Sequence, residues 1–184
     1  MLEWRWIDHL PARPKKFKET GGRIIALTNE QCDELIRAAI GSADSDCWLF
    51  VAFGLNTAMR HSEILRARFD HVDFDKLRLF IPEAKAGERE QPITPELAAM
   101  LRKEREMRQD RQGWIFPARR KDAAAGHRIR MRRPFQDAVE RAGLDPIVIT
   151  PHVMRHSAIT NLVQAGIDLA TIQRISGHKT PSQW

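Results

Sequence analysis

The chain has 184 residues, a formal net charge of +6 and a pI of about 9.8, which suit one basic domain with a single core. The longest apolar run, residues 48–55, is far too short to cross a bilayer, and the charged start of the chain is not a signal peptide. Cys32 and Cys47 are too few for a disulfide framework and lack metal-site spacing, so we expect a cytoplasmic protein with reduced thiols. The positive charge favours nucleic acid as a partner.

The first elements of the chain are an arm and two helices. Residues 1–27 combine prolines, lysines and paired glycines, which interrupt any period and indicate a linker or N-terminal arm. A helix should begin at Thr28, because residues 28–31 fit a capping box and the apolar face that follows extends from Leu35 to Ile40. Residues 47–58 are apolar nearly all round, so this second helix should lie in the core.

An arginine follows the buried helix directly. Arg60 needs an anionic partner if it is desolvated, and Glu63 lies close enough in sequence to supply one. Taken by itself, this piece favours an ordinary surface ion pair.

After the second helix, the spacing of apolar residues shifts toward every second residue, as in a β-strand. Apolar positions in residues 69–74, 77–81 and 91–93 predict three short antiparallel strands, with Phe69 in the first strand and turns at residues 73–76 and 84–88. Lys85 lies in the second turn. A lysine at a hairpin tip is usually just solvated.

A further helix is predicted from Thr94 to about residue 109, with Met107 facing inward, and the apolar segment 113–117 is assigned to the core. A basic stretch follows, in which the only neighbouring acid is Asp122. Such a run is often a solvated surface, but clustered cations also release counterions on DNA, and we prefer contacts to DNA phosphates. The candidate DNA-binding residues are Arg119, Arg120, Lys121, Arg128, Arg130, Arg132 and Arg133.

Two helices close the chain. The Thr150 hydroxyl is expected to cap the first helix, whose spacing puts His152 and Arg155 one turn apart on one face. The second helix should end at Gly177, just before His178.

The pattern His-X-X-Arg, followed after a short helix by Gly-His, resembles the second conserved box of the tyrosine recombinases, the phage integrase family. Residues 56–65 then resemble the first box, with Ala58 where glycine is commoner. The resemblance implies an α+β, mainly helical catalytic domain over residues 28–184, with a small three-stranded antiparallel sheet. It assigns active-site positions to Arg60, Lys85, His152, Arg155 and His178, with Glu63 in a supporting role.

The family cleaves double-stranded DNA with a tyrosine that leaves a 3'-phosphotyrosine, and it needs no metal or cofactor. The resemblance implies that Arg60 and Arg155 hold phosphate oxygens and that Lys85 protonates the leaving 5'-oxygen. His152 would assist proton removal from the nucleophile, and His178 would hydrogen-bond the phosphate.

The sequence contains no tyrosine, and the family's nucleophile would follow Trp184. We therefore expect a catalytic domain truncated before its nucleophile, which binds DNA weakly and forms no covalent adduct. Full-length recombinases of this type act as homotetramers on DNA, whereas this polypeptide should be monomeric when free.

Three alternatives remain open. Residues 157–176 are also compatible with a helix-turn-helix regulator, although its second helix offers few polar side chains for base edges. His152 and His156 have the spacing of zinc ligands in a metal hydrolase, but Val153 stands where that motif has glutamate. A noncatalytic, integrase-like protein that only occupies DNA would carry the same boxes.

Overall fold

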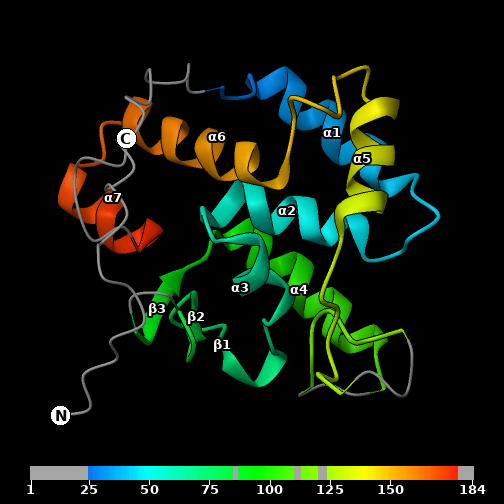
Figure 1. The fold of residues 1–184 in the computed structure, drawn as a ribbon. Helices are drawn as coiled ribbons and strands as arrows, with labels where there is room; N and C mark the ends of the chain where they lie inside the picture. Colours follow the sequence, from blue (N-terminus) through cyan, green and yellow to red (C-terminus); the bar gives the residue numbers. More distant parts are fainter. Residues whose placement is uncertain (1–24, 85–86, 110–112, 120–123, 178–184) are drawn as a thin grey trace, which may run out of the picture.

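A computed structural model describes residues 25–84, 87–109, 113–119 and 124–177 (Figure 1). The fold is mainly helical with one small sheet, as the sequence predicted. In chain order the elements are α1 (Asn29–Ile40), α2 (Cys47–Thr57), α3 (His61–Leu65), a 3-10 helix (Phe69–His71), β1 (Val72–Asp73), β2 (Arg78–Ile81), β3 (Arg89–Pro92), α4 (Pro95–Met107), α5 (Arg132–Arg141), α6 (Pro151–Gln164) and α7 (Leu169–Ser176).

Helix α2 is the centre of the core. In Figure 1, α1, α5 and α6 lie on one side of it, and α4 and the sheet lie on the other. The ring of Phe50 packs edge-on against Phe116 and Phe135, with centroid distances of 6.3 and 6.2 Å. All three rings are fully buried, which is worth about 1.5–3 kcal/mol for each side chain. The prediction of a core helix is therefore confirmed, with the helix ending at Thr57. The prediction of a core segment at residues 113–117 holds for Ile115 and Phe116, which are buried, but not for Pro117, which is exposed.

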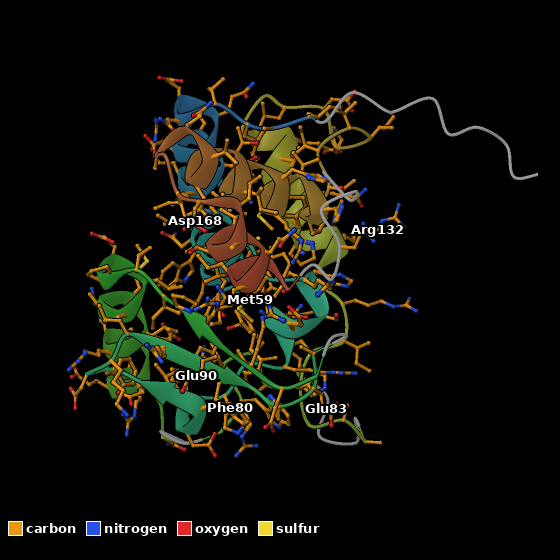
Figure 2. All side chains as sticks on the ribbon, turned by 90° about the vertical axis from the view of Figure 1, so that its left-hand side faces the viewer. Met59, Phe80, Glu83, Glu90, Arg132 and Asp168 are labelled. Atoms are coloured by element: carbon orange, nitrogen blue, oxygen red, sulfur yellow. The ribbon has the colours of Figure 1, made fainter. Side chains whose placement is uncertain are left out.

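The sheet has the order β1-β2-β3 and is antiparallel throughout. Side chains alternate along β2, where Leu79 and Ile81 are buried and Phe80 is exposed (Figure 2). One prediction for this region is wrong, because Phe69 lies in the 3-10 helix and not in the first strand. Its N–H donates to the Gly113 carbonyl at 3.0 Å and its ring is buried, so the chain turns there before the sheet begins.

Helix ends agree with the sequence in part. The capping box at Thr28 is present, with the Thr28 hydroxyl accepting from Gln31 N–H at 3.3 Å. The predicted Thr150 cap is wrong, since the Thr150 side chain makes no capping hydrogen bond and α6 starts with Pro151 at its first position. Met107, expected to face inward, is 66% exposed in the last turn of α4, where no other described element covers it.

The start of the described chain belongs to the core. Leu27 is buried, and its N–H donates to the Ser157 hydroxyl on α6 at 2.8 Å. Residues 1–24 of the predicted arm lie outside the described residues. Within the described ranges, no helix has the length and apolar character needed to cross a membrane.

Candidate active site

The position of Arg60 depends on the turn between α2 and α3. Ala58 is fully buried and adopts a left-handed conformation, with φ of 53° and ψ of 19°. A non-glycine residue pays roughly 1–2 kcal/mol for this conformation. The turn ends α2 and leads into α3, with Arg60 as the residue that caps α3.

Arg60 and Glu63 form more than a surface pair. Arg60 Nη1 and the Arg60 backbone N–H donate to the two carboxylate oxygens of Glu63, each at 3.1 Å. The Glu63 side chain is only 4% exposed and that of Arg60 is 27% exposed. The interpretation of an ordinary surface pair is therefore wrong, because the carboxylate is buried and fixes the start of α3.

Arg155, on α6, is the largest fully buried side chain in the described residues. Its Nη1 donates to the Ala58 carbonyl at 2.6 Å and its Nη2 donates to the Ser176 carbonyl at 2.7 Å. Burial and the nearby charge of Arg60 lower the pKa of Arg155 to about 10, so the guanidinium keeps its charge at neutral pH.

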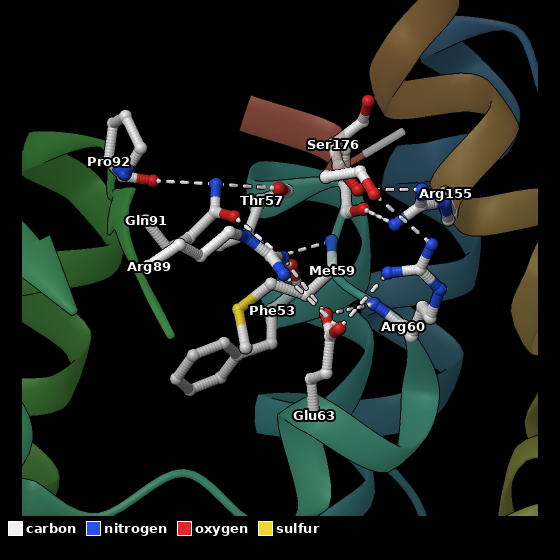
Figure 3. A network of polar contacts seen from close by, with 12 residues as sticks. Phe53, Thr57, Met59, Arg60, Glu63, Arg89, Gln91, Pro92, Arg155 and Ser176 are labelled. Atoms are coloured by element: carbon white, nitrogen blue, oxygen red, sulfur yellow. Dashed lines mark hydrogen bonds and ion pairs between the residues drawn. The ribbon is translucent and has the colours of Figure 1, made fainter. Parts of the chain in front are cut away.

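The two arginines converge on the C-terminal end of α7 (Figure 3). Arg60 Nη2 donates to the Gly177 carbonyl at 3.4 Å, next to the Ser176 carbonyl that Arg155 binds. Two guanidiniums from distant parts of the sequence thus lie at one end of α7.

Sequence reasoning missed Arg89, on β3. Its Nη1 and Nη2 donate to the two oxygens of Glu63 at 3.2 and 2.9 Å, and its side chain is 12% exposed. The signal was the strand period, which puts Arg89 on the same face as the fully buried Gln91. A charged residue on the inward face of a strand requires a buried partner.

Two imidazoles stand beside the arginines. The rings of His152 and His156 lie edge to face with centroids 4.4 Å apart. Partial burial, His156 and the charges of Arg155 and Arg60 all lower the pKa of His152, so its neutral form is favoured. No group of three or more potential metal ligands occurs among the described residues.

Several predicted site residues cannot be placed. Lys85, Arg120, Lys121 and His178 lie outside the described residues. Gly177, the last described residue, ends α7 with a positive φ of 66°.

The basic stretch divides into two groups. Arg119 and Arg128 bind Asp44, each at 2.7 Å, and Arg128 also reaches Asp46 at 3.5 Å. Asp122 is the only acid within this stretch of the sequence, but the fold adds two carboxylates, Asp44 and Asp46, from the segment before α2.

The second group consists of Arg130, Arg132 and Arg133, all of them exposed. No carboxylate of the described residues forms an ion pair with any of the three. Arg132 projects from the edge of the molecule in Figure 2.

A half-open groove extends from Arg130 and Arg132 of this second group to His152. It encloses about 690 Å³, with Arg130, Arg132, His61 and His152 among its lining residues and Phe135 among its apolar ones. A polyanion that lay along the exposed arginines would therefore pass His152.

Comparisons with known proteins agree with the motifs. The sequence model of the phage integrase family matches residues 26–183. An integrase/recombinase from Escherichia coli is 30% identical, over 82% of this chain and 56% of its own length. Tyrosine recombinase XerA from Pyrococcus furiosus is 29% identical, over 85% of this chain and 54% of its own length. The chain thus spans about half the length of these relatives.

Solved structures share the fold. A crystal structure of XerA recombinase matches with a TM-score of 0.69 and 24% identity, over 85% of this chain and 57% of that one. The catalytic domain of bacteriophage HP1 integrase matches with a TM-score of 0.66 and 22% identity, over 85% of this chain and 82% of that one. The family match covers nearly all the described residues and both arginine boxes. The chain therefore belongs to the phage integrase family and carries a tyrosine recombinase catalytic domain.

Proposed function

We propose that this domain holds a DNA phosphodiester for cleavage and rejoining in site-specific recombination. The observation that carries the proposal is the convergence of Arg60 and Arg155 at the end of α7. Guanidiniums match phosphate oxygens in geometry and charge, and buried ones are costly to keep without an anion or acceptor nearby.

The two arginines would stabilise the charge that develops on the non-bridging oxygens. Arg155 is fixed by two backbone carbonyls, and Arg60 by Glu63. Donors fixed in advance need no reorganisation during the reaction, and losing one typically costs about 3–4 kcal/mol of transition-state stabilisation.

Proton transfer would involve His152, Lys85 and His178. The lowered pKa of His152, caused by partial burial and by neighbouring positive charge, supports a role in accepting the proton of the nucleophile. The roles of Lys85 as proton donor to the 5'-oxygen and of His178 as hydrogen-bond donor to the phosphate rest on the resemblance.

DNA would be held mainly by Arg130, Arg132 and Arg133, which are exposed. Arg130 and Arg132 line the groove beside His152, and all three line a neighbouring hollow. Arg119 and Arg128 are less suited, because both are paired with the Asp44 carboxylate. The fold neighbours support a DNA substrate, since a Tn1549 transposon integrase (TM-score 0.72) was solved with transposon right-end DNA and XerH (TM-score 0.67) with its difH substrate.

The nucleophile would be a tyrosine from outside these 184 residues, because the sequence contains none. We further propose that the protein acts in the cytoplasm, that the complete recombinase assembles as a homotetramer on DNA, and that this polypeptide alone is monomeric. Both cysteines, Cys32 and Cys47, are free thiols, which fits a reducing compartment.

Titration with inorganic phosphate tests the phosphate site. Side-chain Nε–H signals of Arg60 and Arg155 should shift in NMR spectra, whereas that of Arg37, an exposed residue paired with Glu34, should not. Arg60→Ala should abolish the shift of Arg155. If phosphate moves neither signal in the unsubstituted protein, the proposal is wrong.

The absent nucleophile has its own test. We expect this polypeptide to give no covalent band on a denaturing gel after incubation with a nicked suicide duplex. A covalent protein–DNA band would refute the proposal that the nucleophile lies elsewhere.

A further inference from the structure

Arg89 joins the small sheet to the arginine site. It lies at the start of β3, and its guanidinium faces the Glu63 carboxylate with both Nη atoms, at 3.2 and 2.9 Å (Figure 3). A third bond, from Nη2 to the Gln91 side-chain oxygen, measures 3.3 Å. This two-point contact fixes the plane of the carboxylate as well as its position.

Glu63 is shared between two arginines. Oε1 accepts from Nη1 of both Arg89 and Arg60, and Oε2 accepts from Arg89 Nη2 and from the Arg60 backbone N–H. Burial by itself would raise the pKa of Glu63, but hydrogen bonds and charge from Arg89, and then from Arg60, lower it, so the group stays ionised. Both oxygens are thus committed, and the carboxylate cannot turn without breaking contacts to both arginines.

Arg89 depends on Glu63 in return. Its Nε is buried and has no hydrogen-bond partner among the described residues. Its Nη1 also lies close under Gly177, where an added Cβ would come within 3.0 Å. Arg89 therefore touches both the carboxylate that orients Arg60 and the turn that ends α7.

We propose that Arg89 is a positioning residue for the phosphate site, which acts by holding Glu63 so that Arg60 keeps the orientation needed to bind phosphate. This inference rests on the proposed function. Both Nη atoms of Arg89 donate to the Glu63 carboxylate, so Arg89 acts on the site through Glu63 and not through a contact of its own with the DNA.

The alternative is that Arg89 only adds positive charge or only stabilises the fold. The affinity for inorganic phosphate, measured by the shift of the Arg60 Nε–H signal at constant ionic strength, separates these roles. Positioning predicts that Arg89→Gln weakens phosphate binding about tenfold, the effect of losing a charge-assisted hydrogen bond. It also predicts that Arg89→Lys weakens binding, because an ammonium cannot span both Glu63 oxygens.

For Glu63→Gln, the electrostatic explanation and the positioning explanation predict opposite changes in phosphate affinity. It removes a negative charge beside the site, so a purely electrostatic effect would tighten phosphate binding. Positioning predicts weaker binding, because the neutral amide cannot pair with both Arg89 and Arg60. The matched control is Arg66→Gln, which removes a charge from the exposed Arg66–Glu83 pair near Arg60 and should change the affinity by no more than about twofold.

Folding is controlled by measuring the affinity below the melting temperature of each variant. If Arg89→Gln does not fold, the affinity is measured instead in Arg89→Lys and in the double variant Arg89→Gln/Glu63→Gln. The double variant preserves the net charge. Wild-type affinity in the Lys variant together with tighter binding in Glu63→Gln would overturn the inference while leaving the phosphate site intact. Failure of the unsubstituted protein to bind phosphate would instead overturn the proposed function.

Discussion

Arg60 and Arg155 donate to the carbonyls of Gly177 and Ser176, two successive residues at the end of α7, although the arginines are far apart in the sequence. The end of α7 is therefore held by the same guanidiniums that we propose for phosphate binding. A change in any one of these groups should affect both the stability of the fold and the geometry of the site.

Replacing Arg155 should destabilise the protein strongly. Arg155→Ala leaves the carbonyls of Ala58 and Ser176 without these donors and opens a cavity in the core, which should lower the free energy of unfolding by about 3–5 kcal/mol. Urea denaturation measures this loss. The exposed Arg132 is the control, since Arg132→Ala should change stability by less than about 0.5 kcal/mol. Equal stability of the two variants would contradict the described burial of Arg155.

Gly177 should tolerate a side chain less well than other glycines of similar conformation. Gly177 and Gly143 have φ of 66° and 70°, so alanine costs roughly 1–2 kcal/mol of backbone strain at either. At Gly177 the new Cβ would also meet Arg89 Nη1 at 3.0 Å, whereas at Gly143 nothing lies within 4 Å. Because Glu63 holds Arg89 in place, we expect Gly177→Ala to cost about 1 kcal/mol more than Gly143→Ala.

Thermal or urea unfolding of the two variants gives that difference directly. Combining Gly177→Ala with Arg89→Gln should remove most of the additional cost, because the shorter amide no longer fills the space below residue 177. A cost at Gly177 no larger than at Gly143, with Arg89 intact, would mean that Arg89 moves aside freely.

Stability should fall as the pH is lowered through the histidine range. Partial burial and nearby positive charge lower the pKa values of His152 and His156 below the ordinary 6.5. The unfolded chain therefore binds more protons than the folded protein just below pH 6.5, so unfolding is favoured as the pH drops. The urea midpoint of the wild type should decrease between about pH 7.5 and 5.5, and the decrease should be smaller in His152→Gln/His156→Gln. An equally steep decrease in the double variant would assign the effect to other groups.

DNA binding should depend on the exposed arginines and not on the paired ones. Each phosphate contact contributes about 0.9 to the slope of log affinity against log salt concentration. Arg132→Ala should therefore lower the slope by about 0.9, measured by fluorescence anisotropy with a labelled duplex. Arg128→Gln should leave the slope unchanged, because the Arg128 side chain is paired with Asp44 at 2.7 Å and is only 12% exposed. The reverse result would place the DNA on the Asp44 side of the molecule.

The sequence predicted the elements whose signals are local. The capping box at Thr28, the apolar helix at residues 47–57 and the glycine after α7 are each specified by a few neighbouring residues, and the structure has all three. Predictions failed where burial decided the outcome. Met107 fits the apolar pattern of α4, but it lies beyond the end of the core and is exposed. Phe69 is buried from the 3-10 helix that precedes the sheet, and not from the first strand.

By itself the sequence determined the family and the two arginine boxes. Residue types at a fixed spacing within one helix or turn can be recognised without knowing the fold. Only the tertiary structure decided which charges neutralise one another. Arg119 and Arg128 form ion pairs with Asp44, which lies far from them in the sequence. Arg89, on a strand, forms an ion pair with Glu63 at the site. The physical reason is that a desolvated charge requires a partner within a few ångströms, and the fold, not the order of the chain, determines which groups come that close.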